Sequence, residues 1–163
     1  MAVEMGNSTI LIASVALIVH IFSAVVWVGG MFFALIVLRP ASGPLDPGTR
    51  LALWRRVFER FFPWVFAAIA LLLLSGFAMV FLVFGGFATI GLHINLMMLI
   101  GIIMVLIFLH LYFAPWKRFR MALDAGDNPA AAAQLNQIRI LVMVNLILGL
   151  VTVAIGSSGR YWG

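Results

Sequence analysis

Two histidines lie within apolar stretches long enough to cross a membrane, and their side chains are the ones in this chain best suited to chemistry. His20 lies within the apolar run of residues 10–38, and His93 lies near the start of the run of residues 92–114. A titratable ring in hydrocarbon is costly, so an intramembrane histidine is by default a candidate functional residue. Because imidazole is a ligand of both haem iron and copper, we expect these rings to hold a metal.

The rise of an α-helix, about 1.5 Å per residue, predicts how deep each ring lies. His20 is 19 residues from the basic residue Arg39, or about 28 Å. His93 is 24 residues from Lys117, or about 36 Å. Both rings are thus expected in the half of the membrane away from these basic residues, within about 8 Å of each other in depth. They can then face each other across a bundle, whereas His110 is only seven residues from Lys117 and belongs to the basic side.

A b-type haem with two axial imidazoles is the first interpretation of this pair. Helical bundles build cofactor sites from side chains on facing helices, and imidazole is a standard axial ligand of haem iron. We therefore predict haem b between spans one and three, in the outer half of the membrane, with His20 and His93 as metal ligands. Trp27, on the same face as His20, would line the pocket. Arg160 would pair with a propionate, as a planar donor suited to carboxylate, although an ordinary interface anchor explains Arg160 equally well.

A copper site is the alternative interpretation. The chain has nine methionines, of which Met31, Met97, Met98 and Met104 are predicted in or near the core. Soft thioethers together with imidazole suit monovalent copper, although methionine also fills gaps in apolar helices without binding anything. Copper transport or resistance would then be the function.

A cofactor-free structural subunit of a membrane complex is the third interpretation. A membrane histidine can simply hydrogen-bond a neighbouring helix, and His20 and His93 would then only pack. His110 is expected to make such a bond with Asn145, because both are predicted about 10 Å into the membrane from the basic side.

The composition is that of an integral membrane protein. Of the 163 residues, 65% are hydrophobic and 9% are charged, against roughly 25% charged residues in a soluble domain. Four apolar runs approach or exceed the roughly 20 residues of a transmembrane helix, at residues 10–38, 61–84, 92–114 and 138–156. We expect a single all-α domain, residues 1–163, folded as a four-helix membrane bundle. The chain has no cysteine, and no carboxylate within these runs, which excludes thiolate, iron–sulfur and di-iron carboxylate sites.

Basic residues predict the orientation of the chain in the membrane. The net charge is +5, and nine of the ten basic residues fall in residues 39–60 and 117–139. Such flanking zones mark the cytoplasmic side, so both termini are expected on the outer, periplasmic side of a bacterial inner membrane, and the charge is no nucleic-acid signal. Residues 49–62 are amphipathic, which predicts an interfacial helix between spans one and two, with a solvated connector as the alternative.

Two short segments resemble a known membrane superfamily. Residues 20–33, HIFSAVVWVGGMFF, and residues 91–96, GLHINL, resemble segments of copper-resistance-protein-D-like membrane proteins and of protoporphyrinogen oxidases of the HemJ type. The resemblance implies a four-helix bundle with family histidines at His20 and His93. It also implies b-type haem in the oxidases and copper handling in the copper-resistance group. Asn95 stands where the oxidases have lysine, so the resemblance implies haem binding rather than protoporphyrinogen oxidation.

The leading prediction is an inner-membrane b-type haem protein that transfers electrons. With two axial histidine ligands, the haem iron has no open coordination position, which favours electron transfer over oxygen binding. Besides the lipid bilayer, its partners would be a quinone or a small redox species reached from the outer side. Enzymatic turnover is left open; if it occurs, the protein is an oxidoreductase. Homodimer formation is also left open.

Overall fold

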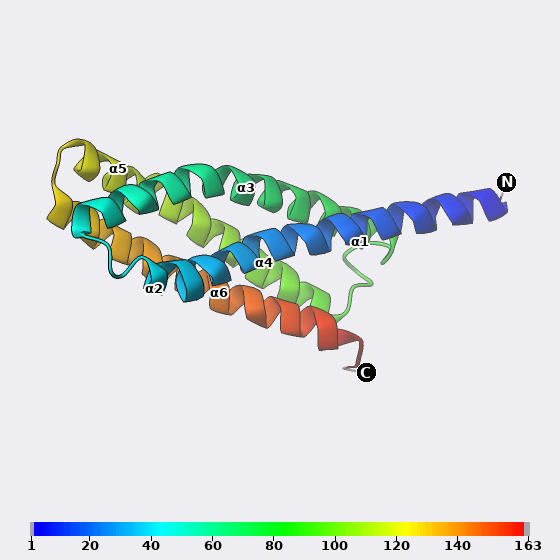
Figure 1. Ribbon diagram of the computed structural model, residues 1–163. Coiled ribbons are helices and arrows are strands. Elements are labelled where there is room, and N and C mark those ends of the chain that lie inside the picture. The colour runs from blue at the N-terminus through cyan, green and yellow to red at the C-terminus, as the bar shows by residue number, and fades with distance from the viewer. Residues whose placement is uncertain (1, 162–163) are drawn as a thin grey trace.

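The chain folds into long helices that run side by side (Figure 1). The computed structural model describes residues 2–161, and the side chains of residues 2–8 and of Arg160 lie outside the described residues. In chain order the elements are α1 (Ala2–Phe32), η1 (Phe33–Leu38), α2 (Arg39–Ala41), α3 (Pro47–Leu82), α4 (Leu92–Leu111), η2 (Tyr112–Trp116), α5 (Lys117–Asp124), α6 (Asn128–Ser158) and η3 (Gly159–Tyr161). η1 and η2 are π-helical turns that continue α1 and α4 without a break.

Four segments of the described chain are long and apolar enough to cross a membrane, namely Thr9–Ala41, Pro47–Leu82, Leu92–Asp124 and Asn128–Ser158. Their outward surfaces carry large exposed apolar side chains, such as Phe22, Leu74 and Leu106. In a bilayer such surfaces contact lipid, and a helix satisfies its own backbone hydrogen bonds there. The expected all-helical fold with four long apolar helices is therefore confirmed, as a multi-pass membrane protein.

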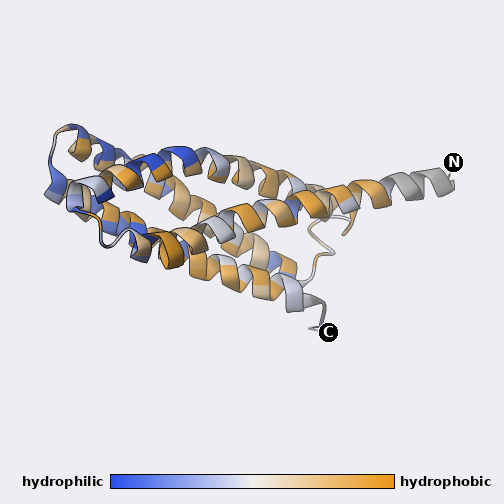
Figure 2. Ribbon diagram, in the orientation of Figure 1, coloured by the Kyte–Doolittle hydropathy of each residue, from blue (hydrophilic) through white to orange (hydrophobic). Residues whose placement is uncertain are grey.

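The two ends of the bundle differ in polarity (Figure 2). One end, which we call the basic end, holds residues 39–60 and 117–139 with nine of the ten basic side chains. The opposite end holds the loop of residues 83–91 and the end of α6. Which end faces the cytoplasm stays a prediction from the distribution of charge.

The helices pack as two pairs that share one core near the basic end. The most extensive contacts join α1 to α3 and α4 to α6. The common core is rich in aromatic rings; Phe62, for example, packs edge-on against Phe108 and Trp116. This core extends from the basic end as far as Trp27 and Met104 and includes neither His20 nor His93. The two histidines therefore lie beyond the core that joins the pairs.

The amphipathic stretch 49–62 differs from its expected form. It is the first part of α3, which runs without a break through Pro63 into the second span. The apolar face of the stretch is covered by protein, because Trp54, Phe58 and Phe62 are buried in the core, with Phe58 edge-on to Trp116. The structure therefore shows no separate interfacial helix here, since aromatic side chains of η2 and α5 cover the stripe that was expected to face lipid.

Aspartate side chains begin the two helices that follow the turns of the basic end. Asp46 accepts a hydrogen bond of 3.0 Å from the backbone N–H of Thr49, and Asp127 accepts one of 2.9 Å from that of Ala130. Each satisfies a backbone donor that the first turn of a helix leaves unpaired. A salt bridge between Arg55 and Asp124 joins α3 to α5 at this end.

Candidate functional site

His20 lies on α1 with its ring held against α3. Its Nδ1 atom is 3.0 Å from the hydroxyl oxygen of Ser75, and that hydroxyl donates its hydrogen to the carbonyl of Leu71 at 2.6 Å. A serine hydroxyl has one hydrogen and two lone pairs. We assign the proton of the imidazole to Nδ1 on this geometry, because a hydroxyl that donates to Leu71 accepts from the ring; Nε2 then keeps a lone pair. A neutral imidazole in this tautomer can ligate a metal through Nε2.

The residue after Ser75 completes the seat for the His20 ring. A Cβ placed on Gly76 would lie 3.3 Å from Cε1 of His20, so a larger side chain would crowd the imidazole. Sequence reasoning assigned no chemistry to Ser75 or Gly76. The only signal was a Ser-Gly pair in an otherwise apolar span, and their sequence distance from His20 gives no hint of contact.

His93 lies near the start of α4 and packs against the end of α6. A Cβ on Gly159 would come within 2.5 Å of Cγ of His93, so this position admits the ring only because it is glycine. One turn further along α4, Met97 lies against Gly156, whose added Cβ would be 2.8 Å from Cε and 3.3 Å from Sδ of the methionine. An imidazole and a thioether thus follow each other on one face of α4, opposite Gly159 of η3 and Gly156 of α6.

The same face of α4 continues to Met104. The contacts of Met104 provide a reference depth from which the positions of both His20 and His93 can be measured. A Cβ on Gly149 would touch Val28 at 2.8 Å and Met104 at 3.2 Å, so these three residues lie at one level. His20 is eight residues from Val28 and His93 is 11 residues from Met104, or about 12 Å and about 16 Å toward the opposite end. The rings are close in depth, but His20 leans on α3 and His93 on α6. A single cofactor held by both stays a prediction.

Trp27 and Arg160 were the other expected pocket residues. Trp27 is 3% exposed and packs edge-on against Phe108 in the common core, two turns from His20 toward the basic end. The side chain of Arg160 lies outside the described residues. Its pairing with a propionate stays a prediction.

The expected hydrogen bond between His110 and Asn145 is wrong. Asn145 is buried and donates through Nδ2 to the backbone carbonyl of Met104 at 3.1 Å, whereas His110 is exposed on the surface of α4. The two residues were matched by depth alone, and depth says nothing about the side of the helix on which each one lies. Among the described residues, Oδ1 of Asn145 has no hydrogen-bond partner.

The donors available for a metal are imidazoles and thioethers. In the part of the chain that the structure describes, no three histidine or carboxylate side chains come together in a metal-binding arrangement. Met97 is the thioether next to His93 along its face of α4, and Met104 continues the same face toward the core. Such a set favours a soft monovalent ion over a hard divalent one.

Comparison with known proteins gives one family. A family model described as copper resistance protein D matches residues 55–158, more than half of the 163-residue chain. The matched segment contains Ser75, His93 and Met97, and His20 lies before it. No curated protein and no solved structure matches the chain. The resemblance to the copper-resistance group is therefore confirmed.

Proposed function

Because the chain belongs to the copper resistance protein D family, we propose that it binds monovalent copper inside the membrane and acts in copper handling. The observation that carries the proposal is the placement of His93 and Met97 one turn apart on α4, inside the matched segment and against Gly159 of η3 and Gly156 of α6. The family favours this function over the electron-transferring haem protein that was the leading prediction from the sequence.

The chemistry of the pair suits monovalent copper. Side chains four residues apart on a helix are neighbours, about 5–6 Å between Cβ atoms, so His93 and Met97 can converge on one ion. Thioether and imidazole are ligands of monovalent copper. Both groups are neutral when they ligate, so they avoid the cost of a carboxylate in hydrocarbon.

His20 supplies a further nitrogen donor at a similar depth. Its Nδ1 is hydrogen-bonded to Ser75, and a hydrogen bond of this kind holds the orientation of a metal-binding imidazole. Met104 lies seven residues from Met97, about 10 Å deeper toward the basic end. Soft donors thus extend from the level of the histidines to the common core, as a path for copper would require.

The membrane in which the protein acts, and its orientation there, are also part of the proposal. The charge distribution favours a bacterial inner membrane with the basic end in the cytoplasm. His20 and His93 would then lie toward the periplasm, and copper would enter the bundle from that side.

Copper binding by the purified protein tests the proposal. Monovalent copper is titrated into the detergent-solubilised protein against a coloured chelator, with metal analysis and an absorption spectrum of the same sample. We expect copper binding that weakens in His93→Ala and Met97→Leu. His110→Ala is the matched control, because it removes an exposed histidine of α4 at the basic end. A Soret band with stoichiometric iron and no copper binding would instead establish the haem protein, and a sample that binds neither would leave a structural subunit.

A further inference from the structure

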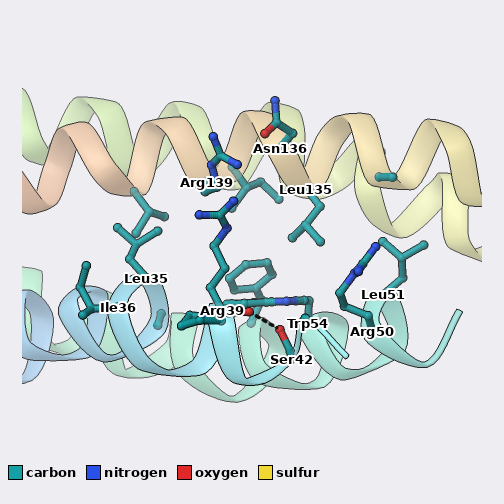
Figure 3. A pocket seen from close by; sticks show the side chains of 17 residues that line it. Leu35, Ile36, Arg39, Ser42, Arg50, Leu51, Trp54, Leu135, Asn136 and Arg139 are labelled. Atoms are coloured by element: carbon teal, nitrogen blue, oxygen red, sulfur yellow. Dashed lines mark hydrogen bonds between the residues drawn. The ribbon is translucent and has the colours of Figure 1, made fainter. Parts of the chain in front are cut away.

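A large pocket opens at the basic end, away from His20 and His93. It has a volume of about 710 Å³ and lies between η1 and α2, the start of α3, and α6 (Figure 3). Its inner wall is made by Leu51, Trp54 and Phe58, which are buried in the common core. The pocket therefore has a fixed apolar floor.

Three arginines line this pocket, and no carboxylate does. Arg39 comes from the end of the first span, Arg50 from the first turn of α3 and Arg139 from α6. Figure 3 shows Arg39 reaching across the pocket toward α6, the helix that carries Arg139. Among the described residues none of the three has an ion pair, because the salt bridges of this end join Arg55 to Glu59 and Asp124.

This arrangement of charge calls for an anion. Like charges at short range repel, more strongly where protein walls keep the local dielectric constant low. An oxyanion placed between two guanidinium groups turns that repulsion into two attractions. The planar fork of arginine matches the oxygens of phosphate in two parallel hydrogen bonds.

The apolar side chains of the remaining wall indicate what kind of molecule carries the anion. Leu35, Ile36 and Val142 line the pocket on the side of the spans, and Ile36 is 56% exposed on the apolar outer surface. The pocket thus joins a cationic head region to a surface that faces lipid. A free inorganic ion would leave these apolar side chains uncovered, whereas an amphiphile would cover them with its chain.

We propose that this pocket binds an anionic phospholipid, whose headgroup phosphate lies between Arg39 and Arg139 and whose acyl chain runs along Leu35 and Ile36. A zwitterionic lipid fits less well, because its own cation would face three arginines. Basic pockets between membrane helices are a known kind of site for anionic headgroups. The proposal is independent of copper binding.

Native mass spectrometry of the full chain released from detergent tests the proposal, with phosphatidylglycerol or phosphatidylcholine added as the probe. We expect phosphatidylglycerol to stay bound and phosphatidylcholine to dissociate. In the double variant Arg39→Gln, Arg139→Gln, the affinity for phosphatidylglycerol should fall about tenfold or more, since a hydrogen bond to a charged group is lost on each side. The double variant Arg56→Gln, Arg118→Gln is the matched control, because it removes two exposed arginines of the basic end that do not line the pocket.

Four results would overturn the proposal. Equal losses in the two double variants would show a general attraction between a basic surface and anionic lipid, without a site. Equal retention of both lipids would exclude selection by charge. Displacement of phosphatidylglycerol by inorganic phosphate at equal affinity would identify a soluble ion as the occupant. Should the double variant fail to fold, the single variants Arg39→Gln and Arg139→Gln replace it, and unchanged affinity in both would also exclude the site.

Discussion

Nδ1 of His20 lies 3.0 Å from the hydroxyl oxygen of Ser75, across the interface of α1 and α3. Because that hydroxyl also lies 2.6 Å from the carbonyl of Leu71 and donates to it, we assign the imidazole proton to Nδ1. In this assignment Ser75 of the second span orients the ring of His20 and leaves Nε2 for a ligand.

The variant Ser75→Ala tests how far copper binding depends on the orientation of the His20 ring while the ring itself stays in place. In Ser75→Ala the ring of His20 loses the acceptor that fixes it, and loss of such a hydrogen bond to a metal-binding histidine typically costs 10- to 100-fold in affinity. We expect a fall in copper affinity within about that range and a loss of stability of about 1 kcal/mol. Both are measured by copper titration and thermal unfolding in detergent.

Ser14→Ala is the control for that experiment. Ser14 lies on α1, the helix that carries His20. Its hydroxyl donates to the carbonyl of Ile10 at 2.9 Å, and no histidine takes part in this hydrogen bond. Its removal should leave copper binding unchanged. Wild-type affinity in Ser75→Ala would show that copper binding does not depend on the orientation of His20.

Gly159→Ala should displace His93. The new methyl group would need the space within 2.5 Å of Cγ of the imidazole, and overpacking of this kind costs about 1–3 kcal/mol. We expect weaker copper binding and a lower unfolding temperature. Gly101→Ala, on the same helix as His93, has nothing within 4 Å of its added Cβ and should change neither. A Gly159→Ala variant with full copper affinity would count against His93 as a ligand.

The packing of α1 on α3 can be tested at two adjacent glycines. A Cβ on Gly30 would overlap the ring of Phe61, whereas one on Gly29 meets nothing within 4 Å. Gly30→Ala should therefore lower the free energy of unfolding by about 1–3 kcal/mol, and Gly29→Ala should not lower it. Thermal unfolding of the two variants side by side is the measurement, and equal stabilities would contradict the observed contact.

The start of α3 should respond to pH through Asp46. Hydrogen bonds from the side chain and then the backbone N–H of Thr49 hold the pKa of Asp46 below its ordinary value. A depressed carboxyl pKa means that the cap stabilises the helix throughout neutral pH and is lost as the pH falls through the folded-state value. Amide hydrogen exchange at Thr49 should therefore accelerate at acidic pH after correction for its intrinsic rate. In Asp46→Asn, a neutral cap, the corrected exchange should not depend on pH, and an acid response in that variant would assign the effect elsewhere.

The fold was largely predictable from the sequence, because each span is a long apolar run and the helix rise alone relates the depths of His20 and His93. The direction in which a side chain faces was not. Residues 49–62 have one apolar face whether lipid or protein covers it, and the aromatic partner Trp116 comes from a distant part of the chain. Asn145 was matched to His110 by depth, yet it bonds to the backbone of Met104, which no side-chain pattern marks.

The contact of His20 with Ser75 lay beyond sequence reasoning for a related reason. Spans one and two are joined by a turn, which makes them neighbours but does not fix the rotation of either helix about its axis. That rotation is set by which small residues meet, such as Gly76 beneath the imidazole. The pocket at the basic end likewise needs η1, α2, α3 and α6 together, and the sequence shows its arginines only as markers of orientation.

The aromatic core lies near one end of the bundle and stops at the level of Trp27 and Met104. Four helices that share a packed core at one end bend most easily at the other end, where few contacts between the helices resist bending. Bending the α1–α3 pair relative to the α4–α6 pair leaves the edge-on contacts of Phe62 intact. The separation of His20 and His93 is thus set outside the shared core.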